Sequence, residues 1–145
     1  MPIITVKKIV EPKDLEIAFA IRKRVFVYEQ NCPVDLEFEN EEISHHFLAF
    51  ADDIPAGVCR WRQTTMGYKC ERFAVIKEYR NIGVGRYLME ALLANLPLNA
   101  SYIYLHAQLT AMGLYKKFGF VAQGEIFEEA GIQHYKMVKK VNNDI

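Results

Sequence analysis

Two glycines between a strand-like segment and a leucine-spaced helix constrain this chain more than any other feature. The segment Arg80-Asn81-Ile82-Gly83-Val84-Gly85-Arg86 precedes apolar residues at i, i+4 spacing that end before Pro97. Glycine lets backbone N–H groups face a ligand without a Cβ in the way, and the start of a helix favours anions. With Arg80 and Arg86 at its two ends, the loop predicts a phosphate or pyrophosphate ligand. A simple packing turn is the alternative.

Two known phosphate motifs do not fit this loop. The dinucleotide-binding fingerprint requires a third glycine where the chain has Leu88. The Walker loop requires Gly-Lys-Ser/Thr, whereas Gly85 is followed by Arg86-Tyr87. The loop therefore belongs to neither class.

Length and charge narrow the class of protein. The chain has 145 residues, which suits a single domain over 1–145 with a core that needs neither disulfide nor metal. Lys+Arg and Asp+Glu are 18 each, so the formal net charge is zero and gives no reason to expect nucleic-acid or anionic-membrane binding. No signal-peptide pattern and no apolar run of about 18 residues is present, so we expect a soluble, cytoplasmic protein with no membrane partner.

The cysteine and histidine patterns predict no metal site. Cys32, Cys59 and Cys70 form no C-x-x-C pair, so neither a zinc site nor a disulfide framework is expected. Nothing in the sequence supplies the base that a nucleophilic cysteine needs, so we interpret all three as ordinary small residues. His45-His46 lacks further ligands at metal-binding spacing.

The order of periodic segments predicts an α/β (α+β) fold. One helix begins at Pro12 and reaches the region 28–30, a second follows the glycine loop, and Thr110 is expected to cap a third over 111–118 that ends before Gly119. Such a mixture favours a twisted, mostly antiparallel sheet with helices on both faces. The predicted strands are Ile3–Val10, His46–Ala51, Ala56–Thr64, Lys69–Ile76, Ser101–Ala107, Phe120–Gln123 and Gln133–Val141, with a hairpin turn at Asp52-Asp53-Ile54-Pro55.

The pattern Arg80-x-x-Gly83-x-Gly85, preceded on a strand by Phe73-Ala74-Val75 and followed by the leucine-spaced helix, resembles motif A of the GCN5-related N-acetyltransferase (GNAT) superfamily. Two further segments, 24–30 and 131–137, together with His106-Ala107-Gln108, look like the bacterial branch typified by ElaA and YjcF proteins. The family's fold implies a sheet that splays between its fourth and fifth strands. The motifs that carry the resemblance are Phe73-Ala74-Val75, Arg80-x-x-Gly83-x-Gly85 and Tyr115-Lys116-Lys117-Phe118-Gly119-Phe120.

The resemblance implies acetyl-CoA as the donor and direct attack by a primary amine in a ternary complex. The Val75 N–H is then the group that polarises the thioester carbonyl, and Tyr115 the acid that protonates the departing thiolate. A Tyr115 that only packs against Leu105 and Phe118 is the alternative. The cofactor-binding residues implied are Phe73, Ala74, Val75, Arg80, Asn81, Ile82, Gly83, Val84, Gly85, Arg86, Met112 and Tyr115.

The acceptor side and the general base stay open at this point. Glu71 could act as the base or could be a salt-bridged strand residue, for example with Arg60 or Arg62. His106 lies where the cleft should open, and His134 has the same ambiguity. Acidic segments at 35–42 and 127–129 favour a cationic amine, such as a polyamine, an aminoglycoside or a lysine side chain, unless they are solvated loops. The residues predicted to contact the acceptor are Phe26, Glu29, Glu71 and His106.

Three further expectations complete the sequence-based picture. The leading function is an acetyl-CoA-dependent N-acetyltransferase acting on a small-molecule or peptide amine. A non-catalytic acyl-CoA-binding sensor or regulatory module is the alternative from another class. Aromatic strand residues Tyr102, Tyr104 and Tyr135 would suit a homodimer, and a monomer is equally compatible with the sequence.

Overall fold

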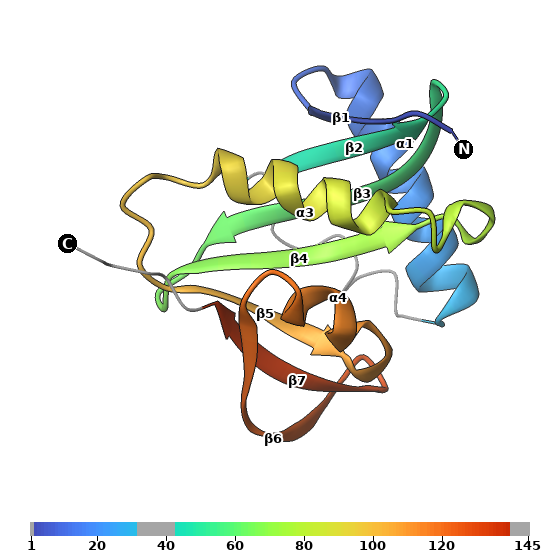
Figure 1. Ribbon diagram of the computed structural model, residues 1–145. Coiled ribbons are helices and arrows are strands. Elements are labelled where there is room, and N and C mark those ends of the chain that lie inside the picture. Colours follow the sequence, from blue (N-terminus) through green and yellow to red (C-terminus); the bar gives the residue numbers. More distant parts are fainter. Residues whose placement is uncertain (1, 32–42, 140–145) are drawn as a thin grey trace.

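The computed structural model describes residues 2–31 and 43–139, which contain one seven-stranded sheet (Figure 1). Its strand order is β1-β2-β3-β4-β5-β7-β6, and β4–β5 is the one parallel pair in these residues. The strands are β1 (Ile4–Lys8), β2 (His45–Ala51), β3 (Ile54–Gln63), β4 (Tyr68–Val75), β5 (Ile103–Gln108), β6 (Phe120–Glu129) and β7 (Ile132–Lys139).

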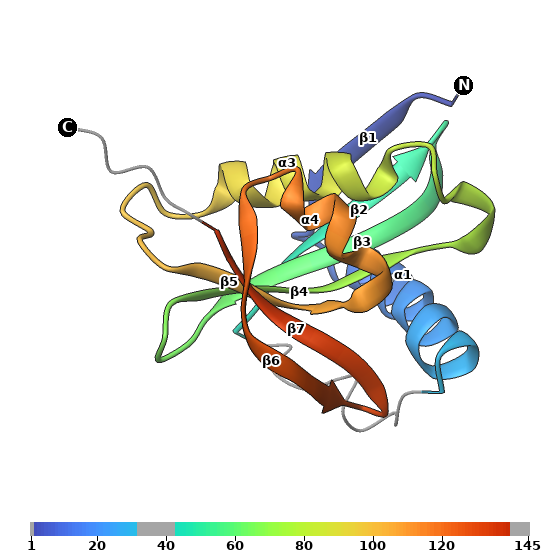
Figure 2. The ribbon, with the colours of Figure 1, turned by 60° about the horizontal axis from the view of Figure 1, so that its bottom comes forward.

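Helices cover both faces of the sheet, as predicted. On one face α3 packs through Leu88 and Leu92 against the apolar side chains of β2, β3 and β4. On the other, α1 and the π-helical η1 pack through Ile21 and Val25 against Leu48 (Figures 1 and 2). No helix of the described ranges is long and apolar enough to cross a bilayer. The helices are α1 (Pro12–Arg22), η1 (Lys23–Glu29), η2 (Lys77–Tyr79), α3 (Val84–Asn95), η3 (Leu109–Ala111) and α4 (Met112–Lys116).

A bulge in β4 separates it from β5. Val58 pairs with Ala74 and Arg60 with Glu71, so Arg72 and Phe73 together oppose one residue of β3. Arg72 takes a left-handed backbone conformation, with φ +58°. A bulge bends its strand and increases the local twist. Accordingly, β5 pairs with β4 only over 68–70, before the bulge, and the two strands then diverge. The splay between the fourth and fifth strands that the resemblance implied is therefore present.

Several predicted boundaries needed correction. The first helix does reach Glu29, but from Lys23 onward it is π-helical, which apolar spacing cannot signal. Thr110 does not cap α4, because η3 intervenes and no side chain caps the helix at Ala111. Gly119 does end the following turn, with φ +88° and its N–H donating to the Lys116 carbonyl.

The last hairpin also differs from the prediction. β6 continues to Glu129 rather than ending at Gln123, because a register shift between Gln123 and Phe127 absorbs Gly124 at φ +77°. In the earlier hairpin the turn consists of Asp52 and Asp53, both at positive φ, so that β3 already begins at Ile54. Asx residues tolerate this conformation better than most.

Candidate active site

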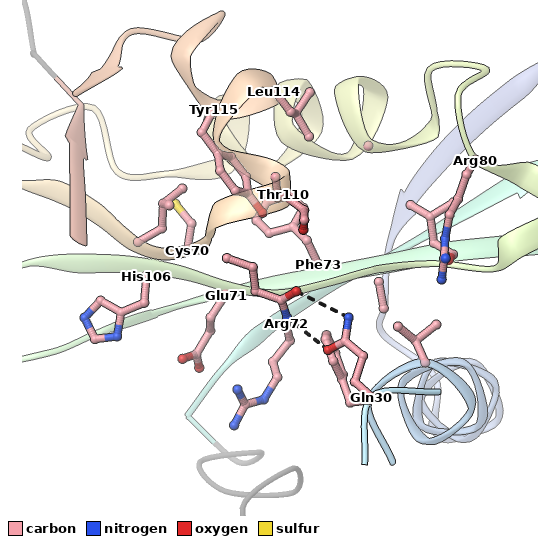
Figure 3. Close-up of a pocket in the computed structure, with 18 of the residues that line it drawn as sticks. Gln30, Cys70, Glu71, Arg72, Phe73, Arg80, His106, Thr110, Leu114 and Tyr115 are labelled. Carbon is pink, nitrogen blue, oxygen red and sulfur yellow. Dashed lines mark hydrogen bonds between the residues drawn. The ribbon is translucent and has the colours of Figure 1, made fainter. Parts of the chain in front are cut away.

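The divergence of β4 and β5 opens a cavity of about 800 Å³. Its lining comes from both faces of the sheet, as Figure 3 shows: Tyr115, Leu114 and Thr110 lie on one side of β4, and Glu71 and His106 on the other. Most of the predicted site residues line it: Phe26, Glu71, Phe73, Ala74, Val75, Arg80, Asn81, Gly83, Val84, Gly85, Arg86, His106 and Tyr115. Glu29, Ile82 and Met112 do not.

The glycine loop forms one end of this cavity. Gly83 is the N-cap of α3 and has φ +98°, a conformation that favours glycine. Gly85 lies against Leu114 of α4, where an added Cβ would stand 3.0 Å from Leu114 Cδ2. The first N–H groups of a helix have no partner within it. The loop thus presents backbone donors and the positive end of the α3 dipole to the cavity, which suits a phosphate group.

The edge of β4 beyond the bulge presents backbone groups to the cavity. Ile76 N–H donates to the Ala56 carbonyl (2.9 Å), which directs it toward β3. Successive N–H groups of a strand point to opposite edges, so the Val75 N–H points toward the gap. Within the described residues β5 does not pair with β4 beyond Cys70 and therefore does not occupy this edge.

Arg80 and Glu29 form an ion pair, although the sequence predicts a cofactor contact for Arg80 and an acceptor contact for Glu29. The Arg80 guanidinium donates to both Glu29 carboxylate oxygens at 2.7 Å, and Arg80 Nε donates to the Val75 carbonyl at 2.9 Å. The hydrogen bond from Arg80 lowers the pKa of Glu29. The pair therefore links the end of η1, on one face, to the loop that precedes α3 on the other.

Tyr115 enters the cavity from α4. Its side chain is 7% exposed and makes edge contacts with Phe73 (ring centroids 5.6 Å apart) and Phe120 (6.3 Å). Burial raises the pKa of the Tyr115 phenol. The group is neutral at physiological pH and can donate its proton to a stronger base that forms beside it.

Glu71 is a salt-bridged carboxylate, so the second interpretation of this residue is confirmed. Its Oε2 accepts from Arg60 Nε and Arg62 Nε, both at 2.8 Å, and Lys69 Nζ lies 3.4 Å from its Oε1. Burial alone would raise the pKa of Glu71, but Arg60, Arg62 and Lys69 outweigh it and lower the pKa to about 2. Such a carboxylate is a weak proton acceptor near neutral pH.

His106 has a carboxylate partner that the sequence could not identify. Its Nδ1 lies 3.0 Å from Glu129 Oε2, and the hydrogen bond from His106 lowers the pKa of Glu129. The second cavity histidine, His134, has its Nδ1 2.7 Å from the Ile132 carbonyl oxygen. Glu129 belongs to the acidic segment 127–129 expected at the acceptor side. The other acidic segment, 35–42, lies outside the described residues.

A pair of amides spans the cavity between its walls. Gln30, at the end of η1, and Gln108, at the end of β5, donate to each other at 3.4 and 2.9 Å (dashed lines in Figure 3). The residues belong to segments 78 positions apart, and no local pattern in the sequence joins them. Their contact follows from the splay, which brings the end of β5 beside η1.

The cysteines in the described residues are buried thiols. Burial raises the pKa of Cys59 and, together with nearby Glu71, that of Cys70, although Cys70 lines the cavity. Because the thiolate is the nucleophile, neither group is activated for acyl transfer. Cys32 lies outside the described residues. In those residues no three His, Cys, Asp or Glu side chains form a group that could hold a metal ion, and His45 stacks on Trp61.

Comparison with known proteins gives consistent similarities. Residues 9–141 match the acetyltransferase (GNAT) domain family. The chain is 39% identical over 130 residues to the N-acetyltransferase YjcF of Bacillus subtilis, covering 88% of this chain and 93% of YjcF. Among solved structures, an acyl-CoA N-acyltransferase from Pseudomonas aeruginosa (TM-score 0.80, 28% identity) covers 96% of this chain and 99% of its own. The structure of Escherichia coli ElaA has a TM-score of 0.81 and 25% identity, and the match covers 95% of this chain and 100% of ElaA.

Proposed function

Because the chain belongs to the GNAT acetyltransferase family, we propose that this enzyme transfers the acetyl group of acetyl-CoA to a primary amine of a small molecule or peptide. The amine attacks the thioester directly in a ternary complex, so that no acyl group is attached to the protein. The observation that carries the proposal is the edge of β4: the Val75 N–H faces a cavity that Tyr115 enters from one side and His106 from the other.

The donor is held by backbone groups more than by side chains. The pyrophosphate lies at the N-terminus of α3, where Gly83 and Gly85 leave room that a Cβ would fill and Arg86 supplies positive charge. The pantetheine arm follows the β4 edge over 73–75. Arg80 donates hydrogen bonds to Glu29 and to the Val75 carbonyl, so it holds this edge of β4 in place and its charge is already paired.

Two groups act on the reacting thioester. The Val75 N–H donates to the carbonyl oxygen and stabilises the charge that develops there during attack. Tyr115, kept neutral by burial, protonates the sulfur as it leaves. The amine approaches from the α1 face, where Phe26 of η1 and the β6–β7 hairpin form the walls of the cavity.

Calorimetric titration of the purified protein with acetyl-CoA tests the donor, with ATP and NAD as controls. We expect acetyl-CoA alone to bind, because only that ligand combines a pyrophosphate with an arm that matches the β4 edge. Release of the free CoA thiol with spermidine, kanamycin and a lysine-containing peptide then tests the transfer. Binding without turnover on any amine would favour the non-catalytic acyl-CoA module, and no binding by the folded protein would refute both functions.

A further inference from the structure

His106 lies at the point where the sheet opens. Leu105 is the last residue of β5 that pairs with β4, and His106 follows it. Three side chains surround the imidazole: Glu129 bonds its Nδ1 at 3.0 Å, Phe127 meets it edge-on at 4.9 Å, and Tyr104 lies 6.0 Å away between ring centroids. The ring is therefore held in one orientation while its side chain stays 22% exposed in the cavity.

The hydrogen bond between His106 and Glu129 joins β5 to β6 across the intervening strand β7. β7 lies between β5 and β6, so Glu129 is not a sheet neighbour of His106. The irregularity after Gln123 and the left-handed turn at Ala130 and Gly131 shape the hairpin that carries Phe127 and Glu129. Figure 1 shows this hairpin, β6 and β7, curling away from the rest of the sheet. The result is a partly buried hydrogen bond between side chains that ordinary strand pairing would not bring together.

The tautomer of His106 follows from this contact. A carboxylate can only accept, so the Nδ1 of His106 carries the hydrogen when Glu129 is ionised. The Nε2 of the neutral ring then has a lone pair. A carboxylate that fixes an imidazole in this way also stabilises the imidazolium once Nε2 has taken a proton.

His106 and Tyr115 stand on opposite faces of the gap. Leu105 and Ala107 point into the core beneath α3, together with Tyr115. Side chains alternate along a strand, so His106 points to the α1 face, and Figure 3 shows it on the side of β4 away from Tyr115. A group that accepts a proton from the incoming amine and a group that gives one to the leaving sulfur would have to be separated in this manner.

The neighbouring carboxylates are already paired with arginine and lysine side chains. Glu71 is held by Arg60, Arg62 and Lys69, and Glu29 by Arg80. We propose that His106 is the general base of the transfer, accepting a proton from the acceptor amine at Nε2, and that Glu129 is its positioning residue. The assignment rests on the transferase function proposed above, which left the base open.

The proton transfers balance as follows. One proton of the ammonium form of the acceptor moves to His106 Nε2, and the freed lone pair forms the C–N bond as the carbonyl pair moves to oxygen. When that pair returns, the C–S bond breaks, and the sulfur leaves with its electrons and takes the proton of Tyr115. A second proton from the amine nitrogen restores Tyr115 through solvent. His106 gives its proton to solvent, so each transfer releases one proton.

Charged groups on the strands around His106 and Glu129 also affect the pH dependence of kcat. They are Glu129 on β6, His134 and Lys136 on β7, and Lys69 and Glu71 on β4. The test therefore changes one residue in each variant and leaves the other charged groups in place. His106→Gln removes the base, and Glu129→Gln removes the charge that orients it. Glu125→Gln is the matched control, because Glu125 is an exposed carboxylate on the same strand, β6, and lies outside the cavity lining.

The measurements are the Kd for acetyl-CoA and, from about pH 6 to pH 9, kcat and KM with the best amine of spermidine, kanamycin and a lysine-containing peptide. We expect His106→Gln to lower kcat about 100-fold at pH 7 and to leave the acetyl-CoA Kd unchanged. The loss should shrink with rising pH, because more of the amine is then already deprotonated.

Glu129→Gln separates positioning from structure. We expect kcat to fall at least about tenfold at constant KM, because the imidazole loses the carboxylate that fixes its tautomer and orientation. The acidic limb of kcat should move to lower pH, because an amide stabilises the imidazolium less than a carboxylate does. Glu125→Gln should match the wild type in kcat, KM and pH profile.

A failure of the base assignment can be distinguished from a failure of the transferase function. A His106→Gln enzyme with wild-type kcat, or with a loss that is constant over pH, refutes the base while the transferase function stands. An unmoved acidic limb in Glu129→Gln refutes its positioning role. A wild-type protein that binds acetyl-CoA and acetylates none of the amines refutes the transferase function, and the base assignment with it.

Discussion

The buried cluster around Glu71 gives a stability prediction that the structure quantifies. Arg60, Arg62 and Lys69 surround this carboxylate, whose side chain is 7% exposed. Replacing Glu71 with Gln keeps the shape but leaves the three cations without their shared counter-charge. Removing one partner of a buried ion pair is costly, because the remaining charge stays desolvated.

The magnitude follows from the pKa of Glu71. A shift from 4.5 to about 2 corresponds to about 3 kcal/mol in favour of the folded, ionised form. Because the pKa is lower in the folded state, the unfolded chain binds more protons between about pH 2 and pH 4.5, and stability falls as the pH falls through that window. The same relation gives a loss of about 2 kcal/mol from this group by pH 3.

Urea denaturation of the wild type and of Glu71→Gln at pH 7 and pH 3 measures both quantities. We expect the variant to be about 3 kcal/mol less stable at pH 7 and only about 1 kcal/mol less stable at pH 3. Other acids, such as Glu29 and Glu129, titrate in both proteins and cancel. Glu90→Gln is the matched control: its ion pair with Arg86 is half exposed, so it should change stability little at either pH. An equal difference between wild type and Glu71→Gln at both pH values would refute the reasoning.

Three further substitutions test the site and the packing that builds it. Tyr115→Phe should lower kcat about 100-fold and leave the acetyl-CoA Kd nearly unchanged; equal losses in both would contradict the acid role. Gly85→Glu should weaken acetyl-CoA binding at least 100-fold by calorimetry, because its carboxylate repels the pyrophosphate and its Cβ presses on Leu114 of α4. Binding at wild-type affinity would mean that the loop is only a packing turn. Gly57→Ala should cost about 1–3 kcal/mol by thermal denaturation, because its Cβ would lie 2.9 Å from Val84 Cγ1 and displace α3. The control Gly113→Ala, which meets nothing within 4 Å in a helix, should be neutral or stabilising, and an equal loss there would contradict the packing argument.

Local signals predicted the order of elements well. Apolar periodicity located α3 and the strands, and the glycine loop was placed correctly between β4 and α3. In that loop Asn81 and Gly83 both have positive φ, at +65° and +98°, which Gly and Asn adopt more readily than other residues. The predicted helix cap at Thr110 was wrong, and it too was based on a local signal. Thr110 has the chemistry of a cap, but the chain forms η3 there before α4 begins. A cap residue marks a preference, and the tertiary path of the chain decides whether it is used.

The candidate site was predictable only where one segment carries it. The loop 80–86 and Tyr115 each lie in a recognisable motif. The contacts Glu29–Arg80 and His106–Glu129 join residues 51 and 23 positions apart, through a π-helical segment in one case and an irregular hairpin in the other. Neither geometry leaves a spacing rule in the sequence, so Glu29 was assigned to the acceptor and the partner of His106 was missed.

The short pairing of β4 with β5 has a mechanical consequence. Beyond Leu105, no strand pairing in the described sheet fixes the distance between these strands. Beside this gap, Leu114 of α4 lies against Gly85 of α3, and both residues line the cavity. A larger or smaller side chain at position 114 would therefore narrow or widen the cavity next to the phosphate loop, while the pairing of the sheet strands stays as it is.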